Sequence, residues 1–187
     1  MEKDKLVEEQ SKLEEQFNSG SSWFYWIAGL SLVNMIMLLV NGRWSFIFGL
    51  GITELVDFAT YIFSLELGSV IYYAGIGINL FILSVFMILG RLSKKGYNWS
   101  FIVGIVLYAL DGLLLVWLED YMSALFHVYP LYFIIKGFQA NQKLARIKTY
   151  TCELEDEGLE NKDELTEVQL NFRNEMREMK NRERHNQ

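Results

Sequence analysis

Two carboxylic acids lie three residues apart in the stretch "WSFIFGLGITELVDFATYIF", which begins at Trp44 and is otherwise almost wholly apolar. These acids are Glu54 and Asp57. A charged side chain that faces lipid near the middle of a bilayer costs about 2.5–3.5 kcal/mol on insertion scales. We therefore expect both side chains to face a protein interior, where they are either protonated or paired with another group.

Later apolar stretches carry other residues that can share a proton with these acids. Tyr108 and Asp111 lie in one stretch and His127 lies in another. At about 1.5 Å of rise per helical residue, Asp57, Asp111 and His127 fall in one layer, and Glu54 lies close to the middle of its stretch. No Lys or Arg lies at this depth, so His127 is the only potential cation available to the acids.

Helical spacing groups these polar residues with small ones. Gly49, Thr53 and Asp57 recur every four residues, and Tyr108 and Asp111 are three residues apart. Small residues let helix backbones approach, and polar side chains form hydrogen bonds across the contact. We expect these faces to point at each other or at the stretch that carries the histidine.

The resulting candidate site has two interpretations. In the structural one, which we favour, neutral carboxyl groups, the tyrosine, the threonine and Asn79 join the helices by hydrogen bonds. In the functional one, the same groups form a proton or cation site inside the membrane. The candidate residues are Thr53, Glu54, Asp57, Tyr108, Asp111 and His127.

The sequence gives little support to catalysis. Asp111, Ser123 and His127 are the residue types of a nucleophile triad, but no glycine-rich elbow surrounds Ser123. The chain also has no HExxH motif, no paired CxxC motif and no phosphate-binding glycine loop. We therefore predict a protein that is not an enzyme and has no catalytic residue, no metal and no cofactor.

The distribution of charge indicates the elements that must position these residues. The 187-residue chain is 51% hydrophobic and 15% aromatic, yet Trp23–Phe138 holds only five basic and six acidic residues. This pattern is typical of a membrane-embedded block with soluble tails. The lipid bilayer is thus the expected partner, and the net charge of −6 argues against nucleic acid.

Five stretches are long enough to cross about 30 Å of hydrocarbon as helices. Their connections are short, so we expect consecutive helices to run in opposite directions. The sequence thus predicts an all-α, polytopic transmembrane helix bundle. The five expected spans are approximately residues 23–40, 44–65, 68–89, 98–118 and 121–138.

The second and fourth spans share an internal repeat. "WSFIFGLGITEL" (Trp44–Leu55) and "WSFIVGIVLYAL" (Trp99–Leu110) are identical at six of twelve positions with an offset of 55. We interpret the bundle as one helix followed by a duplicated two-helix hairpin. Because each unit has an even number of spans, both copies run the same way through the membrane.

Basic residues predict the orientation. Five spans place all the basic residues that flank them on one face and Glu66, Glu119 and Asp120 on the other. Because basic loops stay in the cytoplasm, we expect a multi-pass protein of the plasma (inner) membrane with its N-terminus outside and its C-terminus in the cytoplasm. The basic residues are Arg43, Arg91, Lys94, Lys95, Lys136, Lys143, Arg146 and Lys148.

The two ends of the chain are polar. Residues 1–22 form an acidic tail that we expect to be helical, with "NSGSS" (Asn18–Ser22) as a hinge or cap before the first span. Residues 139–187 form a charged cytoplasmic tail with an amphipathic helix over about residues 164–184. That helix could pair with a second copy of the chain, as a homo-oligomer, or dock on a protein partner.

The wording of the apolar block resembles a widespread group of small bacterial multi-spanning membrane proteins. The resemblance covers about residues 20–144 and is carried by "WFYWIAGLSLVN", "WSFIFGLGITELVD", "WSFIVGIVLYALDG" and "FHVYPLYFIIKGFQANQKL". It implies the bundle architecture and brings no activity, cofactor or catalytic residue.

Overall fold

The structure is a computed structural model that describes the backbone of residues 2–39 and 49–156 and the side chains of residues 8–38 and 49–149. Within these ranges every regular element is an α-helix, so the expected fold class is confirmed at that level. The five helices are α1 (Glu2–Leu39), α2 (Gly51–Leu67), α3 (Ser69–Lys94), α4 (Asn98–Trp117) and α5 (Tyr121–Asp156). The predicted amphipathic helix near residues 164–184 lies outside the described residues.

Three of these helices are long and apolar enough to cross a membrane. They are α1, over Glu8–Leu38, together with α3 and α4. The bounds of α3 and α4 agree closely with the third and fourth predicted spans. The expected count of five spans remains a prediction.

The second predicted span is corrected at its beginning. We expected a helix from residue 44, but Gly49 lies in a bend and Leu50 has the extended angles φ −74° and ψ 128°. The helix begins at Gly51 and has 17 residues. Gly49 therefore does not share a helical face with Thr53 and Asp57, as its spacing had suggested.

The helical tails also differ from the expected boundaries. Helix α1 continues through Asn18–Ser22, so the predicted hinge is absent. Likewise α5 runs through residue 138, the expected end of the fifth span, and ends at Asp156. The chain divides into a tail unit (Met1–Leu13 with Gln142–Gln187) and a bundle unit (Glu14–Asn141), and the site lies in the bundle unit.

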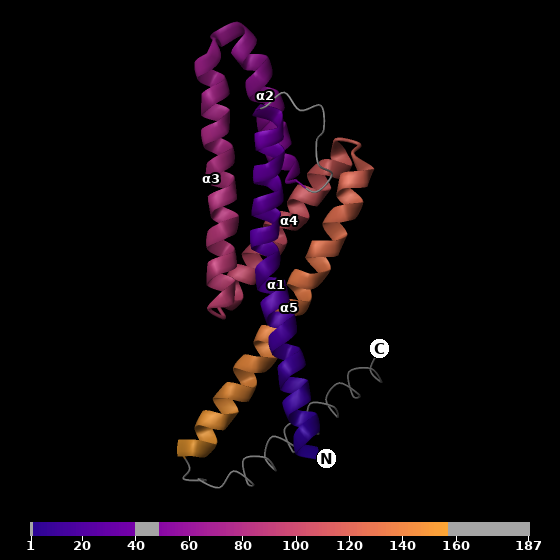
Figure 1. Cartoon of the computed structure of the whole chain (residues 1–187), viewed down its shortest axis with the longest axis vertical. Helices are drawn as coiled ribbons and strands as arrows, with labels where there is room; N and C mark the ends of the chain where they lie inside the picture. Colours follow the sequence, from indigo (N-terminus) through magenta and orange to yellow (C-terminus); the bar gives the residue numbers. More distant parts are fainter. Residues whose placement is uncertain (1, 40–48, 157–187) are drawn as a thin grey trace. The chain divides into compact units, whose positions relative to one another are not determined.

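Short turns connect α2 to α3 and α3 to α4 (Figure 1). Gly68 alone separates α2 from α3, and its φ of 93° lies in the left-handed region that favours glycine. Gly96, with φ 84°, has the same role between α3 and α4. The side-chain amide of Asn141 on α5 donates to the Gly96 carbonyl at 2.9 Å and to Asn98 Oδ1 at 2.8 Å.

The direction of α1 follows from its contacts with α4 and α2. Phe24 packs on Gly104 of α4. One to two turns later, Ser31 bonds to Leu50, and the next residue, Gly51, bonds to Asp111 of α4. Phe24 and then Ser31 of α1 thus lie level with Gly104 and then Asp111 of α4. The two helices therefore run in the same direction.

The direction of α2 follows from α3. Asn79 of α3 bonds to Thr53 of α2, whereas the earlier residue Gly75 packs on Thr60. Thus α2 and α3 are antiparallel (Figure 1). Because Gly90 of α3 packs on Phe24, α3 is antiparallel to α1 as well.

Consecutive helices α1 and α2 therefore run in the same direction, contrary to the expected alternation. The short predicted connection between them assumed that the second helix began at residue 44. Because α2 begins at Gly51, the connection is longer than expected. Residues 40–48 of this connection lie outside the described residues. The shared direction of α2 and α4 is the one that a parallel repeat requires.

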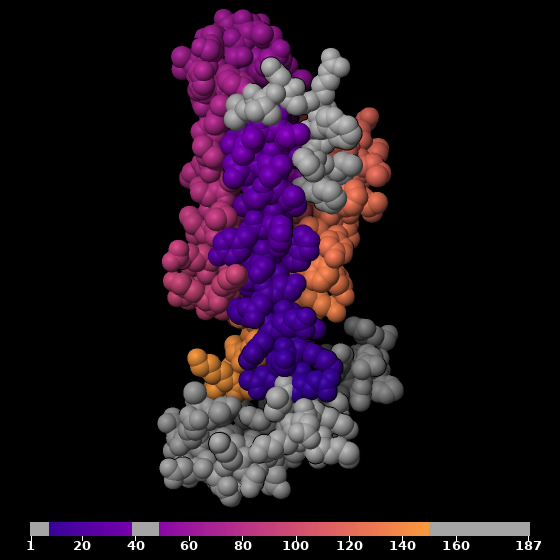
Figure 2. All heavy atoms as spheres, in the orientation of Figure 1, coloured from indigo at the N-terminus to yellow at the C-terminus, as the bar shows by residue number. Residues whose placement is uncertain are grey.

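The centre of the bundle unit is apolar and aromatic. Helix α1 lies between α3 and α5 on the face shown in Figure 2. Gly20 and Gly137 bring the backbones of α1 and α5 into direct contact, since a Cβ added to Gly20 would lie 2.6 Å from the Gly137 Cα. The buried core includes Phe24, Ile27, Leu50, Leu83, Phe86, Leu89, Phe101, Tyr108 and Ile134.

Candidate functional site

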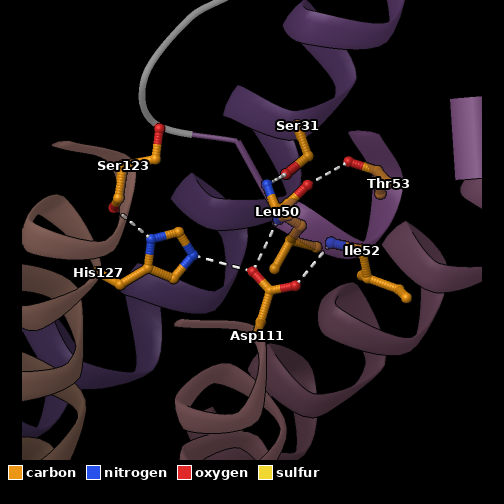
Figure 3. A network of polar contacts seen from close by, with 8 residues as sticks. Ser31, Leu50, Ile52, Thr53, Asp111, Ser123 and His127 are labelled. Atoms are coloured by element: carbon orange, nitrogen blue, oxygen red, sulfur yellow. Dashed lines mark hydrogen bonds and ion pairs between the residues drawn. The ribbon is translucent and has the colours of Figure 1, made fainter. Parts of the chain in front are cut away.

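The first turn of α2 begins in the interior of the bundle unit. The first N–H groups of a helix have no carbonyl partner within it, and leaving such a group buried and unpaired costs about 1–3 kcal/mol. Here the carboxylate of Asp111 on α4 accepts two of them (Figure 3). Its Oδ2 lies 2.9 Å from the Gly51 nitrogen and its Oδ1 lies 2.8 Å from the Ile52 nitrogen.

The residue before the helix is held in the same way. Leu50 is fully buried, and its N–H donates to the Ser31 hydroxyl oxygen of α1 at 2.9 Å. Its carbonyl accepts the Thr53 hydroxyl at 2.7 Å and the Thr53 N–H at 3.2 Å. The N–H groups of residues 50–53 therefore all have an acceptor.

His127 of α5 completes the Asp111 environment. Its Nε2 lies 2.9 Å from Asp111 Oδ2, and its Nδ1 lies 2.8 Å from the main-chain carbonyl oxygen of Ser123 (Figure 3). The imidazole is buried and stacks on the Tyr108 ring, with 4.5 Å between centroids and 18° between planes. Three helices thus meet at one carboxylate.

The hydrogen-bond partners limit how protons are arranged in this pair. The Ser123 carbonyl can only accept, so Nδ1 carries a hydrogen. The remaining proton lies between Nε2 and Oδ2, either on the ring, as an ion pair, or on the carboxyl group. Both arrangements are neutral overall.

Asp57 belongs to a separate contact. The Asn79 side-chain nitrogen donates to Asp57 Oδ1 at 2.7 Å and to the Thr53 carbonyl at 3.3 Å. Asn79 is fully buried, and its Oδ1 has no hydrogen-bond partner among the described residues. Asp57 itself is half-buried.

Glu54 lies between these two contacts. It is half-buried in the first turn of α2, and its carboxyl group forms no hydrogen bond within the described ranges.

Five of the six predicted site residues belong to these two contacts, whereas Glu54 belongs to neither. Asp111, His127 and Tyr108 come together, whereas Asp57 joins Asn79 and the Thr53 carbonyl. Ser31 and the main chain of residues 50–52 were not predicted from the sequence as part of the site. The glycines at 49 and 51 were the available signal, because two glycines two residues apart disfavour a continuous helix.

The site offers few metal ligands. Among the described residues, no group of three or more His, Cys, Asp or Glu side chains is arranged to hold a metal ion. The His127 ring bonds to the main-chain carbonyl of Ser123, rather than to the hydroxyl group that a nucleophile triad would use.

No protein-family model matches this chain, and comparison with curated proteins and with solved structures likewise yields no match.

Proposed function

We propose that this chain is a non-enzymatic integral membrane protein, of structural or accessory type, whose buried polar cluster holds the helix bundle together. The observation that carries the proposal is that Asp111 of α4 joins the main chain of α2 to the imidazole of α5. The cluster stabilises the bundle by supplying acceptors to a helix end that has no water around it.

The number of bonds in this contact supports a structural role over an ion-handling one. Three donors bond to the two oxygens of Asp111, and both ring nitrogens of His127 have partners. An ion or a transported proton that bound at Oδ2 would compete with two of these bonds. Displacement would leave a buried main-chain N–H or a buried charge without a partner.

The proposal includes a multi-pass location in the plasma (inner) membrane. The three long apolar helices and the charge-poor block support it. So does the resemblance to the group of small bacterial membrane proteins. The architecture expected from the sequence has five spans, built from one helix and a duplicated two-helix hairpin. The segment near residues 164–184 is proposed as a contact with a second copy or a protein partner.

Proton flux in vesicles tests the structural role. The purified protein is reconstituted into liposomes that contain a pH-sensitive dye, and an imposed pH gradient is followed with valinomycin present. We expect the gradient to decay no faster than in protein-free liposomes. Faster decay that is abolished in the folded double variant Glu54→Gln with Asp57→Asn would overturn the proposal.

The alternative function is a small proton- or cation-coupled transporter or channel. The observation that favours it is the half-buried Glu54, whose carboxyl group has no hydrogen bond within the described residues. In a membrane such a group must hold a proton or a cation. The flux measurement separates this alternative from the structural role.

A further inference from the structure

The shared direction of α1 and α2 bears on how the chain crosses a membrane. In a protein in which every helix is a complete span, consecutive helices must alternate in direction. Here α1, α2 and α4 run one way, and α3 and α5 run the other. One of the two consecutive parallel helices is therefore not a complete crossing.

Helix α2 is the incomplete one. Its 17 residues extend about 25 Å, less than the roughly 30 Å of a hydrocarbon core. Near its beginning, Thr53 lies beside Asn79, which is close to the middle of α3 (Ser69–Lys94). Thus the beginning of α2 lies level with the middle of α3. Because only Gly68 separates the two helices, the end of α2 lies level with the beginning of α3.

The connection between α1 and α2 is long enough for this path. Leu39 lies eight residues after Ser31, or about 12 Å further along the helix axis. Because Ser31 is level with Leu50, the chain must return by about that distance. The ten residue steps from Leu39 to Gly49 reach about 33 Å when extended, which is ample.

The start of α2 also meets the physical requirement for a helix end at membrane depth. Backbone that is not helical is tolerated there only where protein buries it and satisfies its hydrogen bonds. Gly49 and Leu50 are buried. Ser31 and Asp111 supply the acceptors that water would supply at a membrane surface.

The two ends of the bundle unit lie together. Gly20, near its N-terminal boundary, packs against Gly137, near its C-terminal boundary. Lys94, at the end of α3, lies 5.0 Å from the ring centre of Tyr25 on α1.

Charge is segregated along the same axis. All basic residues of the bundle unit that the structure describes lie towards the end where Gly20 meets Gly137. The acidic residues Glu66, Glu119 and Asp120 lie at the C-terminal ends of α2 and α4, which are at the other end of the bundle unit. Basic flanks remain in the cytoplasm. The basic residues are Arg91, Lys94, Lys95 and Lys136.

Helix α5 runs along α4, from His127 beside Asp111 to Asn141 beside Gly96, and so covers the same depth as α4. We propose that α1, α3, α4 and α5 cross the membrane, that α2 is a re-entrant helix, and that both chain ends are cytoplasmic. This topology replaces the five spans and the outside N-terminus expected from the sequence. It rests on the proposed membrane location of the bundle, but it does not depend on the role of the polar cluster.

Cysteine labelling tests the topology. The native Cys152 reports on the C-terminal side, and Ser11→Cys in a Cys152→Ser background reports on the N-terminal side. Leu67→Cys in the same background, at an exposed position, serves as the control for the opposite side. Each full-length protein is treated with a membrane-impermeant maleimide in intact spheroplasts and after permeabilisation.

We expect Cys152 and Ser11→Cys to be labelled only after permeabilisation, and Leu67→Cys to be labelled in intact spheroplasts. Four crossings place both chain ends on the same side. If intact spheroplasts are labelled at Ser11→Cys and not at Cys152, the two ends lie on different sides and the proposed topology is wrong. Labelling of both ends there would overturn the cytoplasmic assignment. Release of the protein by alkaline carbonate extraction would instead refute the membrane location on which the proposed function depends.

Discussion

Asp111 and Asp57 are both aspartates on apolar helices, yet their partners differ in kind. Asp111 is buried and accepts hydrogen bonds from two main-chain N–H groups and an imidazole. Asp57 is half-buried and accepts one hydrogen bond from the amide of Asn79. The Asp111 carboxylate supplies acceptors to the first N–H groups of α2, whereas the Asp57 carboxylate bonds to one side chain of a neighbouring helix.

This difference determines which chemical features each position needs. At Asp111 both oxygens face donors, so the position requires two acceptors. At Asp57 a single acceptor is enough. We therefore expect the two acids to contribute unequally to stability, and the bonds to main-chain N–H groups distinguish them.

The largest expected effect is that of Asp111→Asn. The amide must place its NH2 group against one of the three groups that bond to the carboxylate, the N–H of Gly51, the N–H of Ile52 or Nε2 of His127. We expect a loss of about 3 kcal/mol in the free energy of unfolding, measured by denaturant titration in mixed micelles. The matched change Asp57→Asn keeps one acceptor, and its effect should stay within about 1 kcal/mol. Equal losses for the two variants would contradict the comparison.

A smaller quantity, the coupling within each pair, sharpens the same contrast. A double-mutant cycle combines Asp111→Asn with His127→Phe, which retains a ring to stack on Tyr108. We expect a coupling of about 1.5–3 kcal/mol. The cycle of Asp57→Asn with Asn79→Leu should give less than about 0.5 kcal/mol, because asparagine at position 57 keeps an acceptor for the Asn79 amide. Similar couplings would show that the two contacts are equivalent.

The smallest expected effect concerns Ser31. Ser31→Ala removes the acceptor of the Leu50 N–H, and we expect a loss of about 1 kcal/mol in the free energy of unfolding. Ser84 is a suitable control because its exposed hydroxyl bonds only to the Phe81 carbonyl of its own helix. Ser84→Ala should change stability by less than about 0.5 kcal/mol. If the two variants behave alike, the support of α2 does not extend to α1.

The sequence predicted those parts of the fold that depend on local composition. Apolar length and short polar dividers placed α3 and α4 to within a few residues at most ends, and counting depth from helix ends brought Asp111 and His127 into one layer. Asn79 was expected among the hydrogen-bonding groups, and it does bond to Asp57. Burial of polar groups in apolar helices is a strong local signal.

The start of α2 could not be predicted in the same way. The residues from Trp44 to Leu50 are as apolar as a span, so hydropathy does not separate them from the helix that follows. The break depends on acceptors that come from Ser31 and Asp111, far away in the chain. Because the helix end is defined by those partners, its position and the direction of α2 follow from tertiary structure.

The bond between Asp111 and Gly51 spans 60 residues, and this separation has a consequence for biosynthesis. A ribosome adds about 5–20 residues per second, so Asp111 is made several seconds after the α2 main chain that it supports. During that interval the N–H groups of Gly51 and Ile52 lack the acceptors that they have in the folded bundle unit. The first turn of α2 is therefore completed only after α4 has been made.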